Sequence, residues 1–201
     1  MNVENLPDIV YHGTISIYKK SLLDGINLKK GNECVDFGQG FYTTTNLEQA
    51  KYFSITQSKK NNIFQESMKS RNNEWIPRYS NPLIIGYKIN KVLLKKYYGL
   101  FFSNCDVRWA EFIYNNRLGI DFLISNYHNI DKKYDFIYGF MADADIANII
   151  QDVKLRKIDF DRFAEAIQPF DQYSQDQLSF HTKNVLQCIE YAGDINLRKD
   201  D

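Results

Sequence analysis

Residues 36–53 read DFGQGFYTTTNLEQAKYF and decide the start of the fold. Gly38 and Gly40 bracket a turn, because glycine supplies backbone conformations that other residues avoid. The aromatic and β-branched residues that follow favour a short strand over residues 41–44. We therefore predict a tight turn that leads directly into a strand.

A helix is predicted to begin immediately after that strand. Asn46 is a good N-cap, and Gln49 stands three residues later, where it can complete a capping box. Leu47, Ala50 and Phe53 recur at helical spacing and would form the apolar face. Strand and helix together give residues 36–53 a defined local structure.

The rest of the chain mixes strands and helices without strict alternation. Further strands are predicted over residues 8–12, 82–89, 100–103, 134–141 and 177–181. Helices are predicted over residues 16–24, 106–117, 145–157, 159–166 and 183–191. This pattern favours an α+β fold over a doubly wound sheet, in a single domain covering residues 1–201.

Two local features of this pattern leave alternatives open. Gly13 either ends the first strand or lets a ligand approach the backbone. Residues 58–80 are polar and are either a flexible insertion or an exposed helix. In residues 177–181 apolar and polar residues alternate, which is the pattern of a half-buried strand.

The charge balance argues against an extended nucleic-acid surface. Twenty-five basic residues balance 25 acidic ones over 201 residues, so no global electrostatic footprint is present. Lysine pairs in the first third would form either a local basic patch or solvated helix ends. The chain has no signal-peptide pattern and no apolar run long enough to span a membrane, so we expect a soluble, cytoplasmic protein.

Metal chemistry is not indicated. The three cysteines and three histidines are widely scattered and match no zinc spacing. No hydrolase, P-loop or Rossmann motif is present, since Gly38-Gln-Gly40 lacks the spacing of a dinucleotide-binding turn. We expect reduced thiols and no metal.

Three predicted strands carry residues suited to a planar, hydroxylated ligand. His12 could bond a ribose hydroxyl, and the backbone of Gly13 could contact a planar amide closely. Tyr42 on a strand and Tyr52 on the next helix could sandwich an aromatic ring, each stacked pair contributing about 0.5–1.5 kcal/mol. Gln177 offers an amide without charge.

These residues resemble those of the NAD-dependent ADP-ribosyltransferases. The resemblance is carried by Tyr11-His-Gly-Thr14, followed by Gly-x-Gly-Phe-Tyr42 with a tyrosine ten residues later. It is greatest to the diphtheria-toxin and poly(ADP-ribose) polymerase branch, whose signature is a His, a Tyr and a Glu on three strands. Residues 139–143 (GFMAD) and 177–182 (QLSFHT) are similar to phrases of a smaller bacterial group in that superfamily.

The resemblance implies a fold in which two small, mostly antiparallel sheets form an NAD cleft. It implies catalytic roles for His12, Tyr42 and Gln177, with Gln177 standing where the family usually has its glutamate. His12 would contact the adenosine-side ribose, and the backbone of Gly13 would hold the nicotinamide carboxamide. Tyr42 and Tyr52 would flank the nicotinamide ring. The remaining residues counted among the NAD-binding set are Thr14, Gly40, Phe41 and Asp143.

The implied activity is transfer of one ADP-ribose from NAD to a macromolecular acceptor, with release of nicotinamide. A protein acceptor is favoured over nucleic acid. A role as a bacterial toxin or effector with a neutralising partner protein is also implied by the resemblance. No metal takes part in the family reaction.

Glutamine at 177 is the departure from the family pattern. A glutamate both binds the ribose hydroxyl and stabilises positive charge in an oxocarbenium-like state, and glutamine keeps only the first role. By analogy with loss of a preorganised group, a rate penalty of order 10²–10³ is expected. The outcomes are a slower mono-transferase, a substitute acid such as Asp143 or Glu111, or loss of catalysis.

Alternatives of other classes remain at this stage. The chain could be a silent NAD- or ADP-ribose-binding module, or an NAD glycohydrolase. It could also be an interaction domain in which Tyr42, Tyr52 and Trp109 are core residues and the histidines are structural. Asp143 could simply cap a helix.

Overall fold

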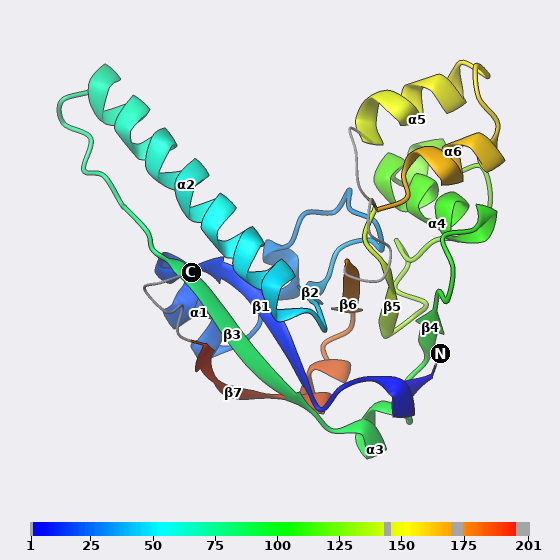
Figure 1. The fold of residues 1–201 in the computed structure, drawn as a ribbon, viewed down its shortest axis with the longest axis horizontal. Helices are drawn as coiled ribbons and strands as arrows, with labels where there is room; N and C mark the ends of the chain where they lie inside the picture. Colours follow the sequence, from blue (N-terminus) through cyan, green and yellow to red (C-terminus); the bar gives the residue numbers. More distant parts are fainter. Residues whose placement is uncertain (1, 143–145, 170–174, 196–201) are drawn as a thin grey trace.

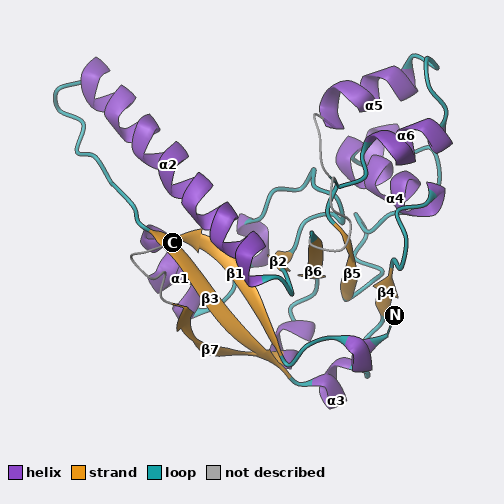
Figure 2. Ribbon diagram, in the orientation of Figure 1, coloured by secondary structure: helices purple, strands orange, loops and turns teal. Residues whose placement is uncertain are grey.

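The computed structural model describes residues 2–142, 146–169 and 175–195, which form an α+β fold with two sheets and flanking helices (Figures 1 and 2). The strands are β1 Ile9–Ile15, β2 Phe41–Thr43, β3 Pro82–Ile89, β4 Gly99–Phe101, β5 Phe136–Phe140, β6 Asp176–Phe180 and β7 Ile189–Ile195. The α-helices are α1 Lys19–Asp24, α2 Leu47–Arg71, α3 Lys91–Leu94, α4 Val107–Leu118, α5 Ile146–Lys154 and α6 Phe160–Ala166. Short 3-10 helices are η1 Val3–Asn5, η2 Ser16–Tyr18, η3 Leu28–Lys30, η4 Ile120–Phe122 and η5 Val185–Cys188.

The strands form two sheets that meet at one point. The first has the order β1-β3-β7 and is antiparallel, and the second has the order β2-β6-β5-β4, in which only β4 and β5 are parallel. Tyr11 and Thr44 exchange backbone hydrogen bonds of 2.8 and 2.9 Å, so β1 is joined to the end of β2. The prediction of an α+β fold with two small, mostly antiparallel sheets is confirmed.

The second sheet separates two hydrophobic cores. One core lies between the sheets and combines Ile85 of β3 with Leu178 of β6. The other lies between the second sheet and helices α4, α5 and α6, and contains Trp109, Ile137 and Phe163. Each of these side chains is fully buried and stabilises the fold by about 1.5–3 kcal/mol. The sheet is therefore held from both faces.

Several elements lie where their local signals predict them. The strand that begins at a proline covers residues 82–89, as expected for an apolar, β-branched run. Asp106 accepts a bond from the Trp109 N–H at 3.0 Å and caps α4. Asp159 caps α6 in the same way, through the Arg162 N–H at 2.9 Å.

Strand β1 does not end at Gly13, so that alternative is wrong. The strand continues to Ile15 and pairs with β3 along its whole length. A Cβ on Gly13 would stand 2.3 Å from the carbonyl oxygen of Ala50, so glycine is needed for α2 to pack on β1. The missing side chain serves helix–strand packing.

The start of α2 also differs from prediction in one respect. Asn46 caps the helix by accepting from the N–H groups of Glu48 and Gln49. Gln49, however, turns away and bonds the backbone of Asp176 in β6 through both ends of its amide, at 2.9 and 3.1 Å. The capping box is therefore wrong, because the glutamine instead ties α2 to the second sheet.

Residues 58–80 contain the exposed helix that was one of their two alternatives. Helix α2 runs as an arm to Arg71, and the chain then returns alongside it (Figure 1). Gln65 accepts bonds from Trp75 Nε1 and the Arg78 N–H, each at 3.0 Å, and so holds the return segment to the helix.

Two predictions near the end of the chain are wrong. β6 is buried on both faces rather than half-buried, because its polar side chains find partners inside the protein. The predicted helix over residues 183–191 is only the 3-10 turn η5, followed by β7. Pairing with β3 overrides the local helical pattern and covers what would be an open sheet edge.

Throughout the three described ranges, no helix is both long enough and apolar enough to cross a membrane.

Candidate functional site

The three predicted catalytic residues lie on neighbouring strands where the two sheets meet. His12 comes from β1, Tyr42 from β2 and Gln177 from β6. His12 Nδ1 lies 2.7 Å from the Tyr42 carbonyl oxygen, across the join of the sheets. Tyr42 pairs with Ser179, so Tyr42 and Gln177 share one face of the second sheet.

His12 is half-buried and neutral. Because a carbonyl can only accept, Nδ1 carries the proton and donates it to Tyr42 O. Burial lowers the pKa of His12 below its ordinary value, and the bond to the Tyr42 carbonyl opposes this only partly. Nε2 is then an acceptor, and the ring leans on Phe41 with centroids 4.5 Å apart.

Gly13 directs its backbone groups toward the join. Tyr11 bonds Thr44 through both its N–H and its C=O. Successive residues of an antiparallel strand point these groups to opposite edges, so Gly13, two residues after Tyr11, points them to the same edge as Tyr11. β2 pairs only as far as Thr44, and within the described ranges no strand continues beside Gly13. The edge therefore offers an unpaired donor and acceptor.

Tyr42 is fastened by its hydroxyl to the turn that precedes it. The hydroxyl donates to the Gly38 carbonyl at 2.7 Å and accepts from the Phe37 N–H at 3.1 Å. Burial raises the pKa of Tyr42 well above its ordinary value, and the nearby charge of Asp36 adds to this. The hydroxyl is thus a structural anchor, and the ring is the part available to a ligand.

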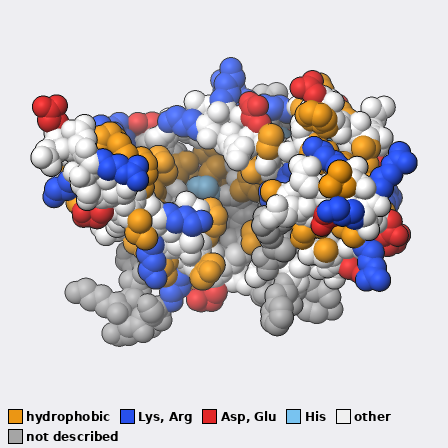
Figure 3. All heavy atoms as spheres, turned by 90° about the horizontal axis from the view of Figure 1, so that it is seen from above, with side chains coloured by type: hydrophobic (Ala, Val, Ile, Leu, Met, Phe, Trp, Pro, Cys, Tyr) orange, Lys and Arg blue, Asp and Glu red, His pale blue; other side chains and the backbone are white. Residues whose placement is uncertain are grey.

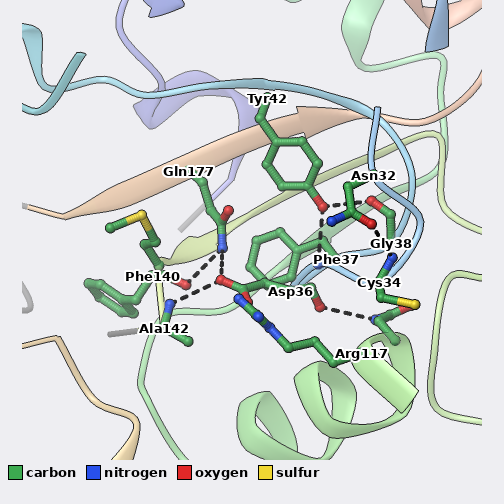
Figure 4. A network of polar contacts seen from close by, with 12 residues as sticks. Asn32, Cys34, Asp36, Phe37, Gly38, Tyr42, Arg117, Phe140, Ala142 and Gln177 are labelled. Carbon is green, nitrogen blue, oxygen red and sulfur yellow. Dashed lines mark hydrogen bonds and ion pairs between the residues drawn. The ribbon is translucent and has the colours of Figure 1, made fainter. Parts of the chain in front are cut away.

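Asp36 is a functional candidate that sequence reasoning missed. The residue is 3% exposed, and its carboxylate accepts from Arg117 Nε at 2.7 Å, from the Ala142 N–H at 3.1 Å and from Gln177 Nε2 at 2.9 Å (Figure 4). Gln177 lies 141 positions away in the chain, so no local pattern could reveal the contact. The carboxylate that the predicted chemistry lacks at residue 177 lies beside it.

The amide of Gln177 has a defined orientation. Its nitrogen donates to the Asp36 carboxylate and to the Phe140 carbonyl at 3.3 Å, and both of these groups can only accept. The carbonyl oxygen Oε1 is therefore the end that faces away from Asp36 (Figure 4). A ligand at this position would meet a hydrogen-bond acceptor.

Tyr52 follows Gln49, which bonds β6, by three residues, so the two are neighbours on the surface of α2. Tyr52 is 75% exposed and lies about 200° around the helix from Ala50, the residue that packs on β1. Phe53 follows Gln49 by four residues and Ala50 by three, so it lies between the face toward β6 and the face toward β1. Phe53 is 49% exposed, so Tyr52 and Phe53 both present an aromatic ring at the surface of α2. The sequence pattern had grouped Phe53 with Leu47 and Ala50 as an apolar face.

Three other residues of the predicted NAD-binding set lie in buried or closely packed positions: Thr14, Phe41 and Gly40. Thr14 and Phe41 are buried in their strands. A Cβ on Gly40 would stand 2.7 Å from Nδ1 of the buried His181, so this glycine is needed for close packing. Glu111, a proposed substitute acid, instead accepts a 2.5 Å bond from Ser125.

Two further predictions can be placed. Trp109 is a core residue whose Nε1 donates to the Phe140 carbonyl at 3.1 Å, as the structural alternative held. Asp143, predicted as a binding residue and a substitute acid, lies outside the described residues.

The join opens on a surface hollow. Seen from above, the molecule is hollowed between the α2 side and the side formed by α4, α5 and α6, with histidine surface on its floor (Figure 3). Among the residues that the structure describes, no cluster of three or more His, Cys, Asp or Glu side chains could hold a metal ion.

Comparison with known families supplies one match. A family described as "Protein of unknown function (DUF3990)" matches residues 9–191. The chain belongs to the DUF3990 family. The match runs from the first residue of β1 to the third residue of β7, so it includes the other six strands and every residue of the candidate site. No curated protein and no solved structure matches this DUF3990 chain.

Proposed function

We propose that this protein is an ADP-ribosyltransferase that moves ADP-ribose from NAD to a macromolecular acceptor and releases nicotinamide. In this proposal the two sheets are those of an ADP-ribosyltransferase-like fold, and NAD binds at their join. We favour a protein as the acceptor, and a toxin or effector role with a neutralising partner protein remains part of the hypothesis.

The observation that carries the proposal is the unpaired edge at Gly13. A carboxamide presents one N–H donor and one C=O acceptor in a plane, which matches the free backbone pair of an edge residue. Nicotinamide would therefore pair with Gly13 along the edge of β1, just beyond the Tyr11–Thr44 pair. Tyr42, which lies just across the join, would offer its ring to the pyridine.

The remaining contacts fit the ribose. His12 Nε2 and Gln177 Oε1 are both acceptors, and ribose hydroxyls are donors. They lie on different strands, β1 and β6, so in this proposal they bind two different parts of an extended dinucleotide. No contact in this set needs a charged side chain to be buried against the ligand.

The reaction would proceed by breaking the bond between ribose C1′ and the nicotinamide nitrogen. The bonding electrons return to the ring nitrogen, so nicotinamide leaves as a neutral molecule and the sugar passes through an oxocarbenium-like state. A nucleophile of the acceptor then bonds C1′ and loses its proton to water. Gln177 would orient the ribose hydroxyl, and mono-transfer is favoured because residue 177 has no carboxylate to activate a second ribose.

Nicotinamide release from NAD tests the proposal. The purified protein is incubated with NAD and cell lysate, and free nicotinamide and labelled acceptor are measured. Tyr42→Ala and His12→Ala are expected to abolish release, whereas Tyr18→Ala, an exposed tyrosine outside the join, serves as the matched control. The proposal fails if the unmodified protein neither labels an acceptor nor hydrolyses NAD.

A second candidate is a silent NAD-binding module, favoured by the fastening of Gln177 to Asp36 and Phe140. Calorimetry distinguishes the two functions. Heat of NAD binding without any nicotinamide release selects the binding module. Nicotinamide release faster than the spontaneous release from NAD without protein selects the transferase or glycohydrolase.

A further inference from the structure

We infer that Asp36 is a positioning residue that sets the orientation of the Gln177 amide, and that its presence is the reason residue 177 is a glutamine. The inference deepens the proposed function and rests on it for its catalytic meaning. Its structural part, the complementarity of residues 36 and 177, can be tested without NAD.

The bonds at Asp36 leave the carboxylate no freedom. Oδ1 accepts from Arg117 Nε at 2.7 Å and from Arg117 Nη2 at 2.6 Å. Oδ2 accepts from Gln177 Nε2 at 2.9 Å and from the Ala142 N–H at 3.1 Å. A buried carboxylate can only accept, so the amide must present its nitrogen to it and its oxygen to the site.

A glutamate at residue 177 would conflict with this arrangement. It would place a second carboxylate oxygen about where Gln177 Nε2 now lies, 2.9 Å from Asp36 Oδ2. Both residues are at most 7% exposed, so water cannot screen the repulsion. One of two buried carboxylates at such a distance has to keep a proton. Glutamine avoids the conflict and still offers an oxygen to the ribose.

Replacing Asp36 by asparagine would invert the amide of Gln177. Arg117 would retain the oxygen of the introduced amide, whose nitrogen then turns toward Gln177 and the Ala142 N–H, where donors would meet donors. Rotation of the Gln177 amide relieves the clash between the two side chains at the cost of its bond to the Phe140 carbonyl, and the Gln177 nitrogen then faces the site. The ribose hydroxyl would lose its acceptor although the side-chain shape is unchanged.

Exchanging the two functional groups tests the inference. In the double variant Asp36→Asn/Gln177→Glu, the amide nitrogen introduced at residue 36 donates to one oxygen of the carboxylate introduced at residue 177. The other oxygen of that carboxylate faces the site. We expect each single variant to release nicotinamide about 10²-fold more slowly than the unmodified protein. We expect the double variant to recover at least tenfold over either single variant.

Thermal unfolding without NAD supplies the second readout. Each single variant should lower the melting temperature, and the double variant should recover part of the loss, since the two residues are in contact. A control cycle of Asp161→Asn and Gln151→Glu, both exposed on α6 and α5, should show no coupling.

The pH dependence of the stability of Gln177→Glu supplies a third readout, which reports on the closeness of residues 36 and 177. Repulsion by the nearby Asp36 carboxylate raises the pKa of the glutamate introduced at residue 177, although the charge of Arg117 opposes this. The variant should therefore lose stability as pH rises from about 5 to about 8, whereas the unmodified protein should not.

The outcomes separate the two hypotheses. Nicotinamide release by the unmodified protein, with recovery in the double variant, supports both. Absence of release together with coupled melting temperatures refutes the proposed function and upholds the pairing of residues 36 and 177. The inference is overturned, whatever the activity, if the decrease in melting temperature of the double variant equals the sum of the decreases of the two single variants.

Discussion

Asp36 and Asp176 are two buried carboxylates on opposite faces of β6, and they differ in what their hydrogen bonds hold. Asp176 accepts from Thr44 Oγ1 at 2.7 Å, from the Thr45 N–H at 2.8 Å, from Thr45 Oγ1 and from Tyr138 OH at 3.0 Å. All of these donors belong to the corner between β2 and α2 or to β5. This network is closed, because every bond fastens one structural element to another.

The network of Asp36 has the same number of donors but is open at one end. Three of its bonds come from Arg117 and the Ala142 backbone, and the fourth comes from Gln177, whose oxygen remains directed away from the network. Buried polar networks that are fully satisfied stabilise one structure. A network that ends on an acceptor to which no described residue donates has, in addition, a group to offer to a ligand, and Gln177 Oε1 is such an acceptor.

The largest expected effect is on the closed network. Asp176→Ala should lower the free energy of unfolding by about 3 kcal/mol, because it leaves several buried donors without an acceptor. Asp36→Ala should cost less, since Arg117 is 27% exposed and can reach water. Urea unfolding measures both, with exposed Asp161→Ala as the control at under about 0.5 kcal/mol. A larger loss of unfolding free energy in Asp36→Ala than in Asp176→Ala would mean that the Asp36 network contributes more to stability.

Acid should weaken the Asp36 side of β6 through His181. This residue is fully buried, bonded to Ser179 Oγ and to the Gln39 carbonyl, and burial lowers its pKa to about 4. The unfolded chain takes up the proton first, near the ordinary value of 6.5, so stability is full above that pH and is lost as pH falls toward 4.

The expected slope in that interval is up to about 1.4 kcal/mol per pH unit. Urea midpoints measured between pH 7 and about pH 4 should fall for the unmodified protein and should fall less steeply for His181→Gln. Equal slopes for both proteins would show that His181 is not the group that titrates.

A smaller effect should follow when one donor of the closed network is removed. Tyr138→Phe deletes the bond to Asp176 and keeps the ring in the core, so we expect a loss of about 1 kcal/mol. NAD binding, measured by calorimetry, should be unchanged, because Tyr138 faces the core between the sheets. If Tyr138→Phe bound NAD more weakly, the Asp176 network would also contribute to NAD binding, and the proposed difference between the two networks would be wrong.

The smallest expected effect distinguishes two adjacent aromatic residues of α2, Tyr52 and Phe53. Phe53→Ala should weaken NAD binding about threefold to tenfold, which corresponds to the loss of one ring contact. Tyr52→Ala, at the neighbour that is 75% exposed and lies farther around the helix from Ala50, should leave affinity unchanged. The opposite result would restore the sequence-based pairing of Tyr42 with Tyr52.

Local sequence signals predicted the elements but not the contacts among them. The strand at residues 82–89 and the caps Asp106 and Asp159 depend on neighbours in the chain, and all three are confirmed. β7 was missed because its strand form depends on pairing with β3, which is distant along the chain. The strand propensity of a few neighbouring residues carries no information about a partner strand that is distant along the chain.

The residues of the candidate site likewise fall into those that local patterns predicted and one, Asp36, that only long-range contacts reveal. The positions of His12, Tyr42 and Gln177 on three strands followed from their local patterns. Asp36 did not, although it opens the stretch that decides the fold, because its ion pair with Arg117 and its bond to Gln177 span 81 and 141 positions. An aspartate before a glycine-rich turn is more often a turn residue than a buried acceptor.

A crystal structure with NAD bound tests the central claim most directly. We predict that the nicotinamide carboxamide pairs with the N–H and C=O of Gly13, beside the ring of Tyr42, and that a ribose hydroxyl donates to Gln177 Oε1. An empty Gly13 edge at millimolar NAD, or NAD bound away from the join of the two sheets, would contradict it.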